Sequence, residues 1–187
     1  MGADAFEPFQ KGSLLLASPQ LMDINFVRAA VLLCEHTREG SFGLILNHKT
    51  DLTLDILIDA IDRPFPVYHG GPVQENSLHI LHCRPDLDLG GDEVVTDVYW
   101  GADIEKLTMA INTNMIQEDE CRIFIGYSGW DAKQLAMECE MNAWFIVPAN
   151  HELVFRVPAR KLWREAFRTL GESYRFLANM PDNPELN

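Results

Sequence analysis

The chain has 187 residues, of which 28 are Asp or Glu and 15 are Lys or Arg, so its formal net charge is −13 at pH 7. Hydrophobic residues make up 47% of the chain and charged residues 23%, which is typical of one globular domain. The negative charge disfavours direct nucleic-acid binding, which needs Lys and Arg to neutralise phosphates. No apolar run approaches the roughly 20 residues of a membrane span, and the acidic N-terminus lacks the order of a signal peptide. We therefore expect a cytoplasmic protein without a membrane contact.

A single domain is predicted over residues 1–187, with a loosely held leader at 1–12 and a tail at 179–187. Apolar runs bounded by turn residues predict buried strands. These strands are expected at 13–17, 29–36, 42–47, 78–83, 93–99 and 153–155. Helices are expected from Thr53 to Ile61, over 102–112, and from Pro158 to Gly171. The last is strongly amphipathic, because its apolar residues recur at helical spacing. Short strands interleaved with a few helices predict an α/β fold of mixed α+β type.

The stretch from Cys121 to Pro148 is the one around which the rest of the chain is expected to be organised. It combines an apolar strand at 123–125, a glycine turn at Gly126–Trp130, a helix to about Glu140 and a second strand at 144–147. Asp131 and Gln134 have the spacing of a capping box at the start of that helix. A ligand would be expected at the turn and helix start of this unit.

The same stretch resembles the signature of the YqgE/AlgH family, because Gly126-Tyr127-Ser128-Gly129-Trp130 is followed by Gln134-Leu135. The resemblance continues through most of the chain in several separate motifs. They include Gly12–Leu15, Phe26–Arg28, Val31–His36, Gly43–Asn47, Gly70–Val73 and Pro184–Asn187. The family usually has Gly where this chain has Lys133, and Arg-Pro is common where it has His48-Lys49. The resemblance implies a bifurcated mixed sheet with a small barrel-like portion and flanking helices. It also implies a small bacterial protein of the kind often labelled a transcriptional regulator, with no activity that can be assigned to particular residues.

Catalytic alternatives are incomplete in the sequence. Gly126-Tyr127-Ser128 supplies only the first half of a nucleophile elbow, because Trp130 stands where the second glycine belongs. Cys34 and His36 share one face of a predicted strand, so a thiol–imidazole pair is another alternative, although Cys34 continues an apolar core run. No Cys or His spacing matches a metal site and no glycine-rich segment matches a phosphate-binding loop, so neither a metal nor a cofactor is expected.

The remaining candidates form a predicted pocket of glycines, aromatic residues and amides. These are Asn47, Gly70, Gly71, Tyr127, Gly129, Trp130 and Gln134. Their alternative role is to lock turns and to pack the end of the sheet. We expect a non-catalytic regulatory protein that acts through a protein partner or a small ligand rather than by direct DNA binding. The alternatives are a small-substrate enzyme that uses the turn Gly126–Trp130, and an interaction module that forms a homodimer.

Overall fold

The computed structural model describes residues 9–180, apart from the side chains of residues 173, 175 and 178. The strands are β1 (Ser13–Ala17), β2 (Ala30–His36), β3 (Gly40–Ile45), β4 (Lys49–Thr53), β5 (Pro66–His69), β6 (Val73–His82), β7 (Asp92–Val95), β8 (Val98–Trp100), β9 (Cys121–Asp131) and β10 (Trp144–Pro148). The helices are α1 (Leu54–Leu57), α2 (Ile104–Asn112), α3 (Gln134–Glu140), α4 (Ala159–Thr169) and α5 (Arg175–Ala178). Short helical turns lie at Ile24–Phe26, Pro85–Leu87, Glu152–Arg156 and Glu172–Tyr174. Within residues 9–180, no helix is both long and apolar enough to cross a bilayer.

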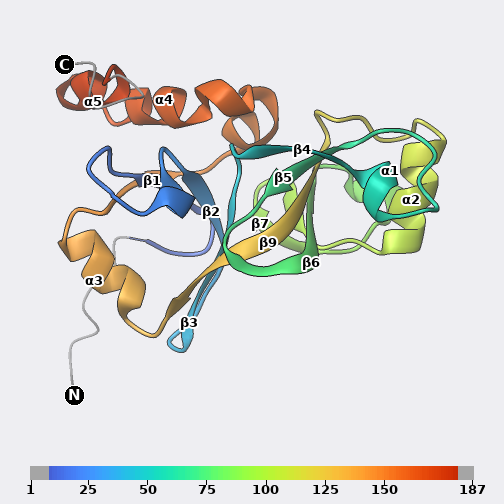
Figure 1. The fold of residues 1–187 in the computed structure, drawn as a ribbon, viewed down its shortest axis with the longest axis horizontal. Helices are drawn as coiled ribbons and strands as arrows, with labels where there is room; N and C mark the ends of the chain where they lie inside the picture. Colours follow the sequence, from blue (N-terminus) through green and yellow to red (C-terminus); the bar gives the residue numbers. More distant parts are fainter. Residues whose placement is uncertain (1–8, 181–187) are drawn as a thin grey trace.

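The strands form one ten-stranded mixed sheet in the order β10-β1-β2-β3-β9-β6-β8-β7. Off this path, β4 pairs with β5, and β5 runs parallel to β9. Strand β9 is therefore shared, since its first part pairs with β5 and β6 and its last part pairs with β3. The sheet divides at β9 into two curled halves with helices around them (Figure 1), which confirms the predicted bifurcated α+β fold.

The predicted glycine turn after Ile125 is wrong, because β9 continues as a strand through Asp131. Gly126 has a φ of +65° inside this strand, and the pairing of β9 with β6 shifts register there. Phe124 and Tyr127 pack against the same hydrophobic cluster, although strict alternation would place them on opposite faces of the sheet. The positive φ of Gly126 interrupts this alternation, at the point where residues 74–77 of β6 lie opposite it. A glycine adopts this conformation without steric penalty.

The β1–β2–β3 half of the sheet is buried on both faces, which explains the continuous apolar runs in the sequence. Leu14 and Leu16 of β1 pack towards α4, whereas Leu15 and Ala17 pack towards α3. A third cluster lies under α1 and α2 at the far end of the molecule (Figure 1), where Leu107 and Ile111 meet Ile123 of β9. Phe9, within the predicted leader, is 3% exposed and packs against His36. Residues 1–8 of that leader and 181–187 of the tail lie outside the described residues.

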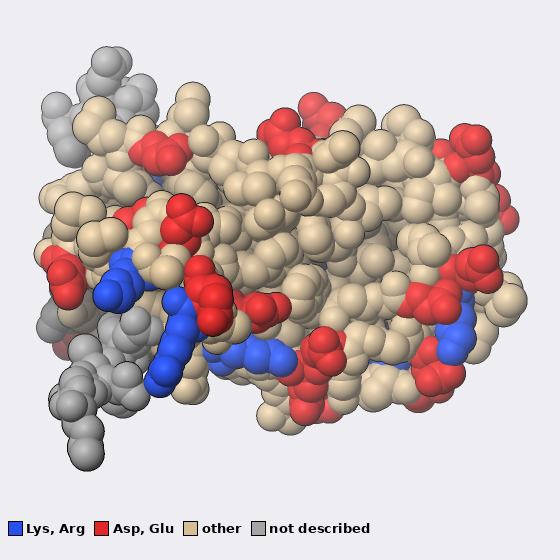
Figure 2. All heavy atoms as spheres, turned by 90° about the horizontal axis from the view of Figure 1, so that it is seen from below, with Lys and Arg blue, Asp and Glu red and all other residues tan. Residues whose placement is uncertain are grey.

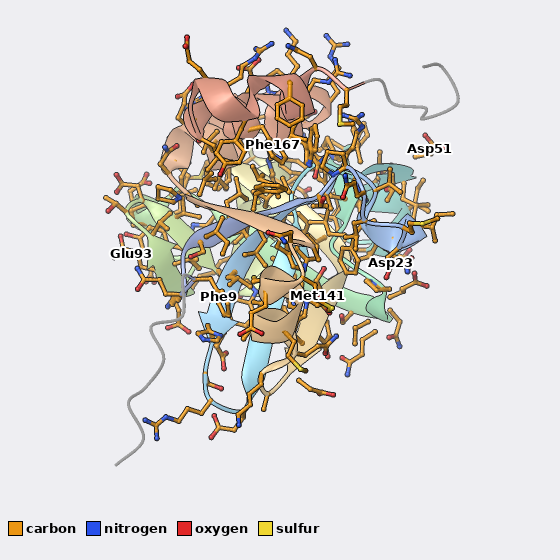
Figure 3. All side chains as sticks on the ribbon, turned by 90° about the vertical axis from the view of Figure 1, so that its left-hand side faces the viewer. Phe9, Asp23, Asp51, Glu93, Met141 and Phe167 are labelled. Carbon is orange, nitrogen blue, oxygen red and sulfur yellow. The ribbon has the colours of Figure 1, made fainter. Side chains whose placement is uncertain are left out.

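Helix α4 confirms its sequence prediction. Leu170, one of five residues expected to face inward, is partly buried against the core, and the other four are buried. They are Leu162, Trp163, Ala166 and Phe167. Phe167 lies on the inner side of the α4 layer, from whose outer side basic groups project (Figure 3). Gly171 ends this segment with a φ of +99°, as expected of a glycine after a helix.

Other element predictions need correction. The apolar run Leu153–Phe155 is not a strand but part of a π-helical turn, with all three side chains buried, because a short apolar run does not by itself distinguish a strand from a buried helical turn. The helix after Thr53 ends at Leu57, and the Thr53 side chain makes no capping hydrogen bond. The predicted strand at 93–99 is the hairpin β7–β8, with Asp97 at a φ of +61° in its turn.

Helix α3 begins later than the capping-box pattern predicts. The Gln134 side chain does accept a hydrogen bond from the Asp131 amide at 3.0 Å, which is one half of a capping box. The residue at the helix boundary is Lys133, however, and it has a φ of +66°. This left-handed conformation is sterically unfavourable for a residue with a Cβ. It gives a physical reason for the glycine that the resembled family usually carries at this position.

Candidate functional site

The seven predicted pocket residues do not meet in one cavity; they lie in three places. Tyr127 and Trp130 fall on opposite faces of β9, because Tyr127 packs with the α4-side cluster and Trp130 with the α3-side cluster. Asn47 lies apart from both clusters, in the loop between β3 and β4. The three locations have different partners and different exposure, so each is described separately.

Gly70 and Gly71 directly follow β5, where the chain passes very close to residues 126–128 of β9. We call this close approach of two backbone segments the crossing. A Cβ on Gly70 would lie 2.3 Å from the carbonyl oxygen of Gly126, and a Cβ on Gly71 would lie 2.3 Å from the carbonyl carbon of Tyr127. The Gly70 amide donates to the Ile125 carbonyl at 2.9 Å. This close approach gives both glycines a packing role at the crossing.

Ser128 lies within the same crossing and is fully buried at 0% exposure. Its hydroxyl donates to the Gly70 carbonyl at 3.0 Å. A nucleophile elbow needs an exposed serine on a sharp turn between a strand and a helix, and here the serine is inside a continuous strand. The geometry of a nucleophile elbow is therefore absent from this segment.

Tyr127 belongs to a half-buried aromatic cluster on the open face of the crossing. The Phe42 ring stacks on it with centroids 4.6 Å apart, and Trp100 lies 4.6 Å from Phe42 on another side. His79 meets the Tyr127 ring edge-to-face at 5.6 Å, and burial lowers the pKa of its imidazole. Gly129 is exposed beside this cluster, and a Cβ there would lie 3.2 Å from the Tyr127 ring. The cluster joins the two halves of the sheet and presents partly exposed rings.

Trp130 and Gln134 are held by one carboxylate on the other face. The indole N–H groups of Trp130 and Trp144 both donate to Oε2 of Glu138, at 2.9 and 2.7 Å. The Gln134 amide donates to the other oxygen, Oε1, at 2.9 Å. Trp130 and Trp144 are 5% and 4% exposed, so this group of four side chains fixes α3 to the sheet rather than lining an open surface.

Asn47 has two roles at a third location. Its side chain accepts from the Ala30 amide and donates to the Arg28 carbonyl, each at 2.8 Å, so it ties the end of β3 to the start of β2. It also lines an open hollow of about 640 Å³ between β4, β5 and the start of α4. We call this cavity the α4 hollow; it is lined by Asn47, His48, Lys49, Tyr68, Pro158, Ala159 and Arg160.

The other six lining residues of the α4 hollow were not identified from the sequence. The positively charged segment near Arg160 was a visible signal, since residues 156–175 contain six Lys or Arg against two Glu. Nothing in the sequence shows, however, that Lys49 and Tyr68 face this segment, because more than 90 residues separate them from Arg160. The pKa of His48 is lowered mainly by burial, and its Nε2 lies 3.0 Å from the Val27 carbonyl oxygen.

The cysteine and metal alternatives find no support in the geometry. Cys34 and Cys121 are buried, and burial raises the pKa of both thiols well above the ordinary value. Nδ1 of His36 lies 2.8 Å from the Ser41 hydroxyl, while the Cys34 thiol donates weakly to the Leu32 carbonyl. Among residues 9–180, no three His, Cys, Asp or Glu side chains cluster so that they could hold a metal ion.

Comparisons with known proteins agree with the fold and with the motifs. The family model described as AlgH-like matches residues 14–175. A UPF0301 protein of Chlorobaculum tepidum is 41% identical over 183 residues, covering 97% of this chain and 98% of the relative. A UPF0301 protein of Cytophaga hutchinsonii is 39% identical over 180 residues, covering 95% and 98%.

Two solved structures have the same fold. The solution structure of AlgH from Pseudomonas aeruginosa matches with a TM-score of 0.69 and 26% identity, covering 97% of this chain and 98% of the other. A crystal structure of a Corynebacterium diphtheriae protein matches with a TM-score of 0.74 and 20% identity, covering 96% and 95%. The match across nearly the whole chain, together with the shared bifurcated sheet, shows that this chain belongs to the AlgH-like family.

Proposed function

We propose that the protein is a non-catalytic cytosolic regulator that acts by binding a small ligand or a protein partner, and that it does not bind DNA directly. The observation that carries this proposal is the α4 hollow, whose volume of about 640 Å³ lies within the usual range of small-molecule sites, roughly 300–1,000 Å³. The hollow lies where the two halves of the sheet diverge, so an occupant would contact β4, β5 and α4 together.

The charge distribution supports the part of the proposal that concerns DNA. The net charge of −13 produces long-range repulsion from a polyanion. Figure 2 shows one face of the molecule with acidic side chains around its edge, a broad uncharged centre, and Lys and Arg side chains next to acidic ones. Several basic residues elsewhere are also paired, as Arg84 is with Asp86 and Glu120. Paired cations are less available to neutralise phosphates along a duplex.

A binding measurement over a range of salt concentrations tests the proposal. Fluorescence anisotropy of a labelled DNA duplex should show no saturable binding at physiological salt. Tight binding that persists at this salt concentration would overturn the claim about DNA. In parallel, size-exclusion chromatography with light scattering determines whether the purified protein is a homodimer, which would instead support the interaction-module alternative.

A further inference from the structure

We infer that the α4 hollow binds the phosphate group of a small phosphorylated molecule. This inference rests on the proposed function and specifies the class of its ligand. It depends on four features of the described residues: two unpaired cations at the hollow, a buried guanidinium behind it, a helix N-terminus that carries basic residues, and an apolar wall beside them.

Lys49 and Arg160 line the hollow, and within residues 9–180 neither forms an ion pair. Some exposed cations of this chain have carboxylate partners, such as Lys106 with Asp88 at 2.6 Å and Arg168 with Glu165 at 2.6 Å. Among the described residues Lys11, Lys133 and Lys161 also form no ion pair, but none of these three lines the hollow. In a chain with 28 acidic and 15 basic residues, carboxylates are available to pair with most cations. Two cations facing one hollow without such partners make it a local positive site on an acidic protein.

Arg122 adds a positive charge directly behind the hollow. It is 4% exposed, and its guanidinium donates to the carbonyls of Leu46 at 2.6 Å and Val157 at 3.3 Å. The residues that follow these two carbonyls, Asn47 and Pro158, line the hollow. The guanidinium also lies 5.2 Å from the centre of the Tyr68 ring, another lining residue.

The charge of Arg122 is not balanced by a carboxylate among residues 9–180. Its acceptors are neutral carbonyl oxygens, and burial lowers its pKa, although an arginine stays charged in a protein. A buried charge without a counter-charge is unfavourable because water no longer screens it. An anion in the adjoining hollow would supply the missing negative charge through a medium of low dielectric constant.

The start of α4 carries the opposite charge from the one that a helix N-terminus favours. The first turn contains Arg160 and Lys161 and no acidic residue, and Pro158 provides no side-chain cap. The partial positive charge of a helix N-terminus normally attracts acidic side chains and repels basic ones. Within residues 9–180, the amides of Ala159 and Arg160 have no acceptor. A phosphate in the hollow could accept from these donors and offset the repulsion.

The size and lining of the hollow specify an organic phosphate rather than a bare ion. Its volume of about 640 Å³ exceeds what one phosphate group fills. The Tyr68 ring and the Ala159 methyl group provide an apolar wall next to the cations. Aromatic rings stack on planar groups such as nucleobases, so a nucleoside monophosphate is a suitable first probe.

Calorimetric titration with adenosine monophosphate, inorganic phosphate and adenosine tests this inference. Adenosine monophosphate should bind, and adenosine without phosphate should not. The Lys49→Ala/Arg160→Ala double variant should bind at least about tenfold more weakly, because it loses two charge-assisted contacts. The Arg168→Ala variant is the control: it removes one exposed charge from the last turn of the same helix, outside the lining, and should bind like the parent protein.

The outcomes separate this inference from the proposed function. Tighter binding of adenosine monophosphate than of inorganic phosphate would support the inference by placing the organic part in the hollow. Equal binding would contradict an organic ligand, because it would show that the phosphate alone is recognised. Absence of binding by both phosphates, or binding that the double variant retains in full, would overturn the inference while leaving a regulator that contacts a protein partner. Tight DNA binding that the double variant loses would overturn both. Thermal melts of each variant confirm that it is folded.

Discussion

Replacing Glu138 with Ala should destabilise the protein strongly, because one carboxylate holds two buried indoles. In the parent protein, Oε2 of Glu138 accepts from Trp130 at 2.9 Å and from Trp144 at 2.7 Å. The two tryptophans are 5% and 4% exposed, so water has little access to either N–H after the substitution. An unsatisfied buried donor costs about 1–3 kcal/mol, so the two together should lower the free energy of unfolding by about 2–6 kcal/mol.

Urea denaturation followed by tryptophan fluorescence measures this loss. The Glu138→Gln variant should lose about 1 kcal/mol, because an amide oxygen still accepts but without the negative charge. Glu140→Ala is the control, since Glu140 is exposed on the same helix and should change stability by less than about 0.5 kcal/mol. A Glu138→Ala variant as stable as the control would refute the claim that this carboxylate fixes α3 to the sheet.

Three further predictions concern backbone conformation and protonation. Gly70→Ala should cost more than about 3 kcal/mol, because its Cβ would lie 2.3 Å from the Gly126 carbonyl oxygen, and such overpacking against a backbone has little room to relax. Gly129→Ala, whose Cβ meets only side chains, the nearest being the Tyr127 ring at 3.2 Å, should fold nearly normally. Equal losses in urea denaturation would contradict the close backbone approach at Gly70. Lys133→Gly should raise the free energy of unfolding by roughly 0.5 kcal/mol, because relief of the φ of +66° exceeds the added flexibility of the unfolded chain, and a loss of stability would count against this reasoning. Burial lowers the pKa values of His48, His79 and His82 in the folded protein, so the unfolded chain binds protons first and stability should fall as the pH drops below about 6.5; a urea midpoint at pH 5.5 equal to or above that at pH 7.5 would disprove it.

The most accurate sequence predictions were those in which local pattern and final environment agree. Helix α4 buries the side chains that its spacing selects. The runs predicted at 13–17 and 29–36 form β1 and β2, in which residues 13–17 and 30–34 are buried on both faces, as continuous apolar sequence indicates. In these segments the periodicity of side chains directly reflects which faces the core covers.

The errors arose where long-range contacts override a local signal. Gly126 and Gly129 look like turn residues, but β9 extends through both because β3 and β6 pair with it on either side. Leu153–Phe155 looks like a strand, yet it forms a buried π-helical turn before α4. No pattern within a few residues contains this information, since the pairing partners are distant in the chain.

The candidate site shows the same division. The sequence identified residues such as Gly70 and Trp130, which the structure places in close packing and in a buried hydrogen bond. The α4 hollow instead depends on the meeting of Lys49, Tyr68 and Arg160 from three separate elements. Only Asn47 belongs to both the predicted pocket and the hollow. Local motifs therefore predicted residues at the crossing, whereas the α4 hollow could be identified only from the folded structure.

The most direct test of the central claim, that a small phosphorylated ligand occupies the α4 hollow, is an NMR titration of the isotopically labelled protein with adenosine monophosphate. The account predicts that the largest saturable amide shifts fall on the lining residues His48, Lys49, Ala159 and Arg160. Shifts that centre instead on the aromatic cluster of Phe42, Trp100 and Tyr127, or the absence of saturable shifts, would contradict it.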